Sequence, residues 1–242
     1  MQNSAEHVLK TLLDLADSDI AAGSQRFFKT GKGEYGEGDR FLGIRVPTIR
    51  KCVKDVGPLS LDDTAVLMAS VYHEVRMFAL LMLVAKYGAA AEGAEKAAVY
   101  QFYLANTQFI NNWDLVDCSA PHIVGAHLFL QDRQPIFRLI GSKGLWERRI
   151  GIISTLYFIK RDDFSDTLRA AELLLDDRQD LIHKAAGWML REVGKRDQGS
   201  LEGFLNAHYR KMPRTMLRYA IERLPEDERR AYLKGGKQTP HT

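Results

Sequence analysis

Apolar residues recur at helical spacing along almost the whole chain. No segment keeps the strict alternation of apolar and polar residues that marks a half-buried strand. In the first predicted helix, which follows the N-cap residue Ser4, the side chains of Val8, Leu12 and Leu15 fall on one stripe. The pattern therefore predicts an all-helical protein.

Residues that start and stop helices divide the rest of the chain. Pro47 suits the first turn of a helix that ends before Gly57, whereas the glycine-rich segment 30–39 is expected to form a mobile loop. Pro121 should loosen its helix because proline cannot donate to the carbonyl of Asp117. The predicted helices span residues 4–16, 19–29, 47–56, 61–70, 73–87, 92–106, 112–129, 132–140, 145–160, 164–175, 180–194, 199–209, 213–223 and 226–233.

A basic residue opens several of these helices at a regular interval. Arg149, Lys184 and Arg218 are separated by 35 and 34 residues, and Arg76 lies 73 residues before Arg149, close to twice that interval. Two helices in a unit of about 35 residues are typical of a HEAT-like helical-repeat solenoid, an α-α superhelix. Equivalent helices line the concave side of such a solenoid, so the repeated cations should lie along one basic groove.

The composition is that of a folded soluble protein, with 45% hydrophobic and 27% charged residues. No apolar run reaches the roughly 18 residues of a membrane span, and the first residues do not resemble a signal peptide, so we expect a cytoplasmic protein with no membrane partner. Cys52 and Cys118 are too few for a disulfide framework or a thiolate zinc site, and the histidines lack metal-ligand spacing. We therefore expect no metal and no cofactor, in a single domain over residues 1–234 with a flexible tail at 235–242.

Basic residues gather in two segments although the net charge is only +3. Five lie between Arg40 and Lys54 with no acid among them, and five lie between His208 and Arg223 with one acid. On one face, the two clusters would match the phosphate backbone of a duplex. Each cluster alone also fits a solvated helix face, and a basic groove equally suits an acidic protein partner.

An aromatic side chain and a carboxylate share a helix face at Trp113 and Asp117, four residues apart, with Asn111 or Asn112 as the cap. A second indole, Trp188, follows Lys184 by the same interval. Indole faces attract cations and sugar C–H edges, and a carboxylate stabilises an oxocarbenium-like sugar when a glycosidic bond breaks. The same spacing also fits a core tryptophan beside an exposed aspartate.

Four segments of the chain are distinctive in combination. They are Phe41-Leu-Gly-Ile-Arg-Val-Pro-Thr-Ile-Arg-Lys, Trp113-Asp-Leu-Val-Asp117, Trp146-Glu-Arg-Arg149 and Lys184-Ala-Ala-Gly-Trp188-Met-Leu-Arg-Glu. In order and interval they resemble the AlkD-like DNA alkylation repair family, and the resemblance covers about residues 5–233.

The resemblance implies a HEAT-like repeat DNA glycosylase. Such an enzyme removes positively charged alkylated purines, for example 3-methyladenine and 7-methylguanine, by hydrolysing the N-glycosidic bond without base flipping. Asp117 matches the catalytic carboxylate of the family, Trp113 and Trp188 match its sugar-contacting indoles, and Arg149 matches its groove arginine. The positions that match phosphate contacts are Arg45, Arg50, Lys54, Lys184 and Arg214.

We therefore expect a monomeric glycosylase that acts on alkylated double-stranded DNA in base excision repair. A cationic purine leaves as a neutral base, so one carboxylate and two aromatic faces suffice without a general acid. Two alternatives use the same groove: a non-catalytic solenoid that binds DNA structures, and a protein-binding repeat module. The enzymatic hypothesis requires Trp113, Asp117, Arg149 and Trp188 to converge on one water-accessible hollow.

Overall fold

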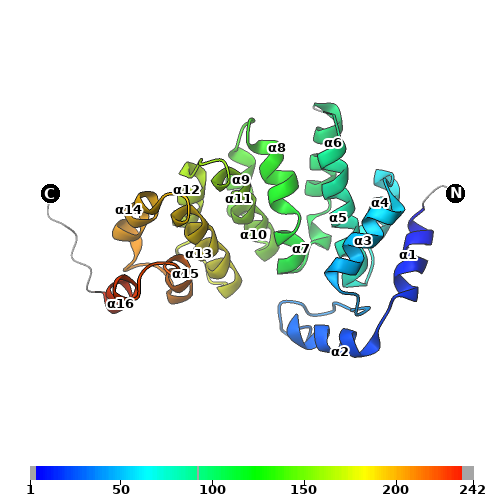
Figure 1. The fold of residues 1–242 in the computed structure, drawn as a ribbon, viewed down its shortest axis with the longest axis horizontal. Helices are drawn as coiled ribbons and strands as arrows, with labels where there is room; N and C mark the ends of the chain where they lie inside the picture. Colours follow the sequence, from blue (N-terminus) through cyan, green and yellow to red (C-terminus); the bar gives the residue numbers. More distant parts are fainter. Residues whose placement is uncertain (1–3, 92, 236–242) are drawn as a thin grey trace. The chain divides into compact units, whose positions relative to one another are not determined.

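The computed structural model shows an all-helical protein and describes residues 4–91 and 93–235 (Figure 1). Within these residues the only β-type pairing is an isolated bridge between Arg40 and Tyr72. The all-helical prediction is confirmed. The predicted flexible tail lies, except for Gly235, outside the described residues.

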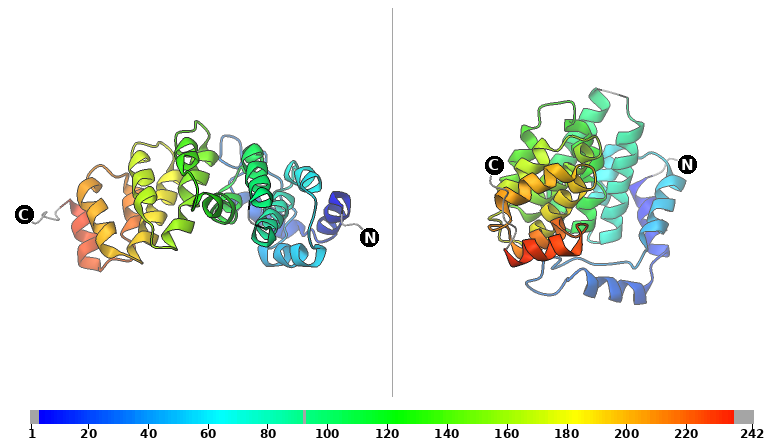
Figure 2. Two further views of the ribbon diagram at one scale, coloured as in Figure 1. Left: turned by 90° about the horizontal axis from the view of Figure 1, so that it is seen from above. Right: turned by 60° about the vertical axis from the view of Figure 1, so that its left-hand side comes forward.

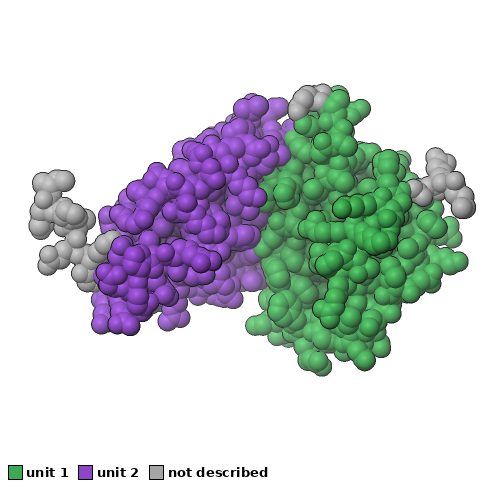
Figure 3. All heavy atoms as spheres, in the orientation of Figure 1, with its two compact units in different colours: residues 1–123 green, residues 124–242 purple. Residues whose placement is uncertain are grey.

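The chain folds as two compact units (Figure 3), and the expectation of a single domain over residues 1–234 stays a prediction. Unit 1 is Met1–Ile123 and unit 2 is Val124–Thr242. The boundary falls inside a turn of π-helix, η2 (Pro121–Gly125). Each unit buries its own set of apolar side chains.

The central helix of unit 1 is α5, His73–Ala89, in which every residue from His73 to Leu83 is buried. A helix that is apolar around its whole circumference must be covered on all sides. The helices α3, α4, α6 and α7 pack against it. The other helices of unit 1 are α1 (Ala5–Asp14), α2 (Ser18–Phe27), α3 (Val46–Val56), α4 (Leu61–Met68), α6 (Ala94–Ala105), η1 (Thr107–Phe109) and α7 (Trp113–Asp117).

In unit 2 the corresponding role belongs to α13, Asp180–Gly194, which packs against α10, α11, α12, α14 and α15. The left-hand view of Figure 2 shows the helices of this unit following one another in chain order, from green to red. The other helices of unit 2 are α8 (Ala126–Leu128), α9 (Gln134–Ile140), α10 (Leu145–Ser154), α11 (Leu156–Ile159), α12 (Ser165–Leu173), α14 (Gln198–His208), α15 (Arg214–Ala220) and α16 (Glu226–Lys234).

The repeat seen in the sequence corresponds to stacked helices within each unit. Arg149, Lys184 and Arg218 lie on α10, α13 and α15, and α13 packs against both of the other two. In unit 1, α5 carries Arg76 and packs against α7, which begins at Trp113. The predicted helical-repeat architecture is confirmed at this level.

Most helix ends lie within a few residues of their predicted positions, for the reasons that the sequence suggests. The Ser4 hydroxyl accepts the backbone N–H of His7 at 3.3 Å and caps α1. Pro47 lies in the first turn of α3, where no N–H partner is needed, and Gly57 ends that helix with a φ of 71°.

Two predicted helices are interrupted. The segment 112–129 forms α7, the π-helical turn η2 and α8, and η2 begins at Pro121, as the missing N–H of proline predicts. The helix predicted over 145–160 is wrong as a single element, because it breaks at Thr155 into α10 and α11. Buried Ser154 and Thr155 donate their hydroxyls to carbonyls of the preceding turn, at 2.6 and 2.7 Å, and such bonds bend helices.

The glycine-rich segment 30–39 forms consecutive turns tied by its own side chains. The N–H groups of Gly31 and Gly33 donate to the carboxylates of Glu34 and Glu37, at 2.9 and 2.8 Å. At Gly36 a Cβ atom would lie 2.5 Å from the carbonyl oxygen of Phe28, so this close approach requires glycine. The segment ends at Asp39, which is buried.

Candidate active site

The five-residue helix α7 carries both Trp113 and Asp117, as predicted, and both side chains are half-buried. Asn112 is the N-cap, and its side-chain oxygen accepts the N–H of Trp113 at 2.9 Å. Because residues four apart share a helix face, α7 presents an indole and a carboxylate on one side.

The indole of Trp113 belongs to an aromatic group from α2 and the residue that follows it. The ring of Phe28 stacks on Trp113 with centroids 5.4 Å apart and an interplanar angle of 25°. Phe27 meets Trp113 edge to face at 6.1 Å and is itself 65% exposed. Trp113 is therefore held on one side by aromatic contacts and is not fully enclosed.

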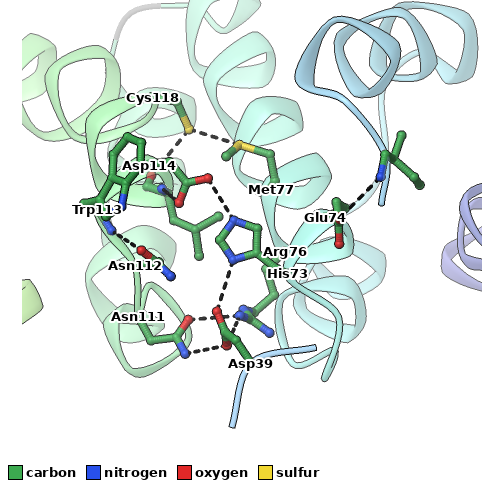
Figure 4. Close-up of polar contacts among 12 residues, drawn as sticks. Asp39, His73, Glu74, Arg76, Met77, Asn111, Asn112, Trp113, Asp114 and Cys118 are labelled. Atoms are coloured by element: carbon green, nitrogen blue, oxygen red, sulfur yellow. Dashed lines mark hydrogen bonds and ion pairs between the residues drawn. The ribbon is translucent and has the colours of Figure 1, made fainter. Parts of the chain in front are cut away.

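A buried histidine links α7 to the rest of unit 1 (Figure 4). His73, the first residue of α5, has its Nε2 2.8 Å from Asp114 and its Nδ1 3.1 Å from Asp39. Burial opposes protonation of the ring, but the hydrogen bonds and charges of Asp114 and Asp39 outweigh it and raise the pKa of His73 to about 9. The side chain is therefore an imidazolium at neutral pH.

The second carboxylate oxygen of Asp39 is also engaged. It accepts Arg76 at 2.6 Å and the side-chain amide of Asn111 at 2.9 Å. Burial favours the neutral carboxyl, yet the His73 hydrogen bond, the Arg76 charge and the Asn111 amide together hold the pKa of Asp39 below its usual value. Asn111, one of the two candidate caps, thus serves this ion pair and not the end of α7.

Glu74 fixes the segment that precedes α3. Its carboxylate accepts the N–H groups of Leu42, Gly43 and Ile44 at 2.8, 2.8 and 3.3 Å. Gly43 has a φ of 84°, and a Cβ atom there would lie 2.0 Å from the carbonyl oxygen of Asp17. The Phe41-Leu-Gly-Ile segment that supported the family resemblance is therefore a packing motif.

The chain has two cysteines, Cys52 and Cys118. Both are free thiols. Burial raises the pKa of Cys118, with the nearby Asp114 charge adding to the effect, and its Sγ lies 3.4 Å from Met77 Sδ. Cys118 therefore lacks the activated thiolate that a nucleophile needs.

Three of the predicted DNA-binding cations lie on or next to α3 and are exposed. They are Arg45, the N-cap residue of this helix, Arg50 and Lys54. Arg50 and Lys54 are four residues apart and share a face, and the charge of Arg50 acts on Cys118 at the end of α7. The charge of Arg50 on α3 therefore reaches the end of the helix that carries Trp113 and Asp117.

Unit 2 contains the other predicted site residues. Arg149 on α10 is only 5% exposed and donates to the carbonyl of Leu181 at 2.7 Å. Trp188 on α13 is half-buried, and its Nε1–H donates to Glu192 at 3.0 Å.

Lys184 and Arg214 are engaged near helix termini of unit 2. Lys184 is 2.8 Å from Asp180 in the first turns of α13. Arg214 is exposed and donates to the carbonyl of Leu233 at 2.9 Å, near the end of α16. The convergence of Trp113 and Asp117 with Arg149 and Trp188 stays a prediction, because the first pair belongs to unit 1 and the second to unit 2.

Two of the four repeated cations are buried where a groove lining was expected: Arg76 is 4% exposed and Arg149 is 5% exposed. Besides its bond to Asp39, Arg76 donates to the carbonyl of Ser70, six residues earlier. Arg148 makes the equivalent bond to Ser142, as does His183 to Asp177. A basic side chain thus closes the turn before α5, α10 and α13, and Arg76 has this structural role instead of the binding role that we expected.

Sequence reasoning missed Asp39, His73, Asn111 and Asp114 as a connected group. The available signal was a charged start, His73-Glu74-Val-Arg76, on a helix that is otherwise apolar. Ionisable residues at buried positions require partners. A charged start on an otherwise apolar helix therefore predicts paired side chains elsewhere in the chain.

The part of the chain that the structure describes contains no group of three or more histidine, cysteine or acidic residues that could hold a metal ion. Among the same residues, no helix is both long and apolar enough to span a lipid bilayer.

Comparisons with known proteins agree with this fold. The family model described as DNA alkylation repair enzyme matches residues 8–224. Among solved structures, the chain is similar to a predicted DNA alkylation repair enzyme from Enterococcus faecalis, with 18% identity and a TM-score of 0.67 over 87% of this chain and 97% of that one. The comparison with curated protein sequences finds no match.

Proposed function

Because the chain belongs to the DNA alkylation repair enzyme family, we propose that it is a DNA glycosylase that hydrolyses the N-glycosidic bond of positively charged alkylated purines in duplex DNA. Its substrates are lesions such as 3-methyladenine and 7-methylguanine. The observation that carries the proposal is α7, which presents a half-buried indole and a half-buried carboxylate four residues apart.

The protein does not have to activate the leaving group, because alkylation has already done so. N-alkylation gives the purine a positive charge, so the base departs neutral and no general acid has to protonate it. Positive charge moves to the sugar as the bond breaks, and the Asp117 carboxylate stabilises this oxocarbenium-like state and orients the attacking water. Neither a metal nor a cofactor enters this reaction.

The indoles bind the sugar rather than the base. The faces of Trp113 and Trp188 offer electron density to sugar C–H groups and to developing positive charge. This mode of binding suits a reaction without base flipping, because an enclosed base pocket is not required. Arg149 matches the groove arginine of the family, and we propose that its charge, fixed by the bond to the Leu181 carbonyl, acts on the substrate although its side chain is 5% exposed.

The proposed substrate is held through its backbone. The exposed cations Arg45, Arg50 and Lys54 in unit 1, with Lys184 and Arg214 in unit 2, contact phosphates and bind duplexes irrespective of sequence. We propose that the protein acts as a monomer and that its product, an abasic site, enters base excision repair.

One experiment tests the assignment of Asp117. Duplex DNA that contains 7-methylguanine is incubated with the wild-type protein, with Asp117→Asn and with the matched surface variant Asp176→Asn, and the released base is quantified chromatographically. We expect Asp117→Asn to reduce the single-turnover rate by about 100-fold or more, since it removes the stabilising charge. Asp176 is exposed on unit 2, and its substitution should leave the rate unchanged.

The other outcomes are informative. Release by Asp117→Asn at the wild-type rate removes Asp117 from the mechanism. No release by any variant, with DNA binding intact, favours a non-catalytic DNA-binding solenoid. Loss of salt-dependent DNA binding as well would leave a protein-binding module.

A further inference from the structure

The surroundings of His73 define its protonation state by geometry. Both ring nitrogens lie within hydrogen-bonding distance of a carboxylate oxygen, Asp39 at 3.1 Å and Asp114 at 2.8 Å. A neutral imidazole has one N–H and one lone pair, so it would turn that lone pair toward one of the carboxylates. Only the imidazolium donates to both.

The charges around the His73 ring balance only when the ring is protonated. The groups that face it are Asp39 from the segment before α3, Asp114 from α7 and Arg76 from its own helix. Its neighbour Glu74 is committed to three backbone N–H groups. Two cations and two carboxylates cancel, whereas loss of the His73 proton leaves a net negative charge in a buried cluster, which is unfavourable.

Two routes connect His73 to the indole of Trp113. The first is covalent, because Asp114 follows Trp113 directly in the first turn of α7. The second is aromatic: the Phe28 ring lies 5.1 Å from His73 and 5.4 Å from Trp113 between centroids. Phe41 stacks on His73 at 4.5 Å and on Phe28 at 5.0 Å, which closes the group.

We propose that His73 is a positioning residue of the glycosylase site, holding the start of α7 and the ring of Trp113 through its paired contacts with Asp39 and Asp114. This inference rests on the proposed function for its catalytic consequence, but not for the contact itself. His73 does not touch substrate; it sets the angle at which Trp113 meets the sugar.

The structural part is tested by ¹⁹F NMR on protein labelled with 5-fluorotryptophan. Trp113→Phe identifies one of the three resonances, and Trp146→Phe is the matched control on unit 2. In the wild type, the Trp113 resonance should titrate with a midpoint near the His73 pKa of about 9. In His73→Gln it should differ from wild type at neutral pH and lose this titration, whereas His7→Gln, at an exposed site on α1, should change neither.

Asp114→Asn provides a second variant if His73→Gln does not fold. Removing one carboxylate partner should lower the midpoint of the Trp113 titration toward neutral pH, because a neutral amide stabilises the imidazolium less. A Trp113 resonance that does not titrate in the wild type, or that titrates equally in these variants, would overturn the proposal.

The catalytic part is read separately from binding. With alkylated duplex DNA at neutral pH, His73→Gln should reduce the single-turnover release rate by about tenfold or more, because a misplaced indole lowers the rate of bond cleavage. The DNA dissociation constant should stay within about twofold, because the phosphate contacts are unchanged. An unchanged rate with a displaced Trp113 resonance would refute the catalytic role. If the wild type releases no base, the proposed function fails, and the NMR titration still decides whether His73 positions Trp113.

Discussion

At the residue scale, four charged side chains from α5, α7 and the segment before α3 form one cluster. Asp39, His73, Arg76 and Asp114 form ion pairs of 2.6 to 3.1 Å. Taking charges out of water is costly, and removal of a single partner leaves the others uncompensated. The cluster therefore need not add to the net stability of the fold, but it holds the side chains beside Trp113 in one defined arrangement.

The raised pKa of His73 predicts a dependence of stability on pH. The pKa is 6.5 in the unfolded chain and about 9 in the folded protein. Stabilisation by the imidazolium is thus complete below pH 6.5 and is lost as the pH rises through about 9. The shift corresponds to about 3 kcal/mol of unfolding free energy.

Urea unfolding measured at intervals across this pH range checks the prediction. The wild type should lose stability on the alkaline side, and His73→Gln should show a flatter profile in the same window. An equal decline in both proteins would assign the effect to other groups. The pKa of Asp39 is lowered, so the ionised carboxylate stabilises the fold above pH 3.8, and this contribution is lost only as the pH falls below that value.

At the element scale, close packing between equivalent helices of unit 2 depends on glycine. A Cβ atom on Gly187 of α13 would lie 2.5 Å from the carbonyl oxygen of Met216 and 2.6 Å from the Cβ of Tyr219, both on α15. The backbones of these repeats approach so closely that even a methyl group does not fit. This explains the glycine in the motif Lys184-Ala-Ala-Gly-Trp188.

Gly187→Ala should therefore destabilise the protein, by about 1–3 kcal/mol, because the two helices must separate. The matched control is Gly203→Ala, at a helical glycine of α14 with no atom within 4 Å of the added Cβ. That substitution should stabilise by about 0.5–1 kcal/mol, since alanine favours helix and limits the unfolded chain. Thermal or urea unfolding measures both changes, and equal effects of the two would contradict the packing argument.

At the scale of the whole molecule, the cations proposed to hold DNA are distributed over both units. Arg50 and Lys54 belong to unit 1, and Lys184 and Arg214 belong to unit 2. Every phosphate contact releases counterions, so the number of contacts appears in the slope of the logarithm of affinity against the logarithm of salt concentration.

The double variants Arg50→Gln/Lys54→Gln and Lys184→Gln/Arg214→Gln should each lower the magnitude of this slope by about 2, and their combination by about 4. Lys10→Gln, an exposed lysine on α1, is the control and should leave the slope unchanged. Fluorescence anisotropy with an unmodified duplex at several salt concentrations is the measurement. Additive losses indicate that both units contact DNA, and a loss in only one double variant restricts binding to that unit.

Local chemistry was sufficient for much of the fold. Helix periodicity, the Ser4 cap, Pro47, Gly57 and Pro121 predicted most helix ends and the loosened turn before α8. These features depend on neighbours within one or two turns, so the sequence contains them directly. The break at Thr155 was not predicted, because a buried serine or threonine hydroxyl can bond to the preceding carbonyls or to other partners. The sequence does not show that Thr155 bonds to the Ile152 carbonyl.

By itself the sequence determined that the chain is helical, that its helices repeat every 35 residues or so, and that α7 carries an indole and a carboxylate on one face. Which charged residues are buried together depends on how the helices pack. His73 meets partners 34 and 41 residues away, and Arg76 turns inward to Asp39 although its place in the repeat corresponds to that of the exposed Arg218. Such pairings follow from how the helices pack, because the free energy of a buried charge depends on the groups that surround it in space.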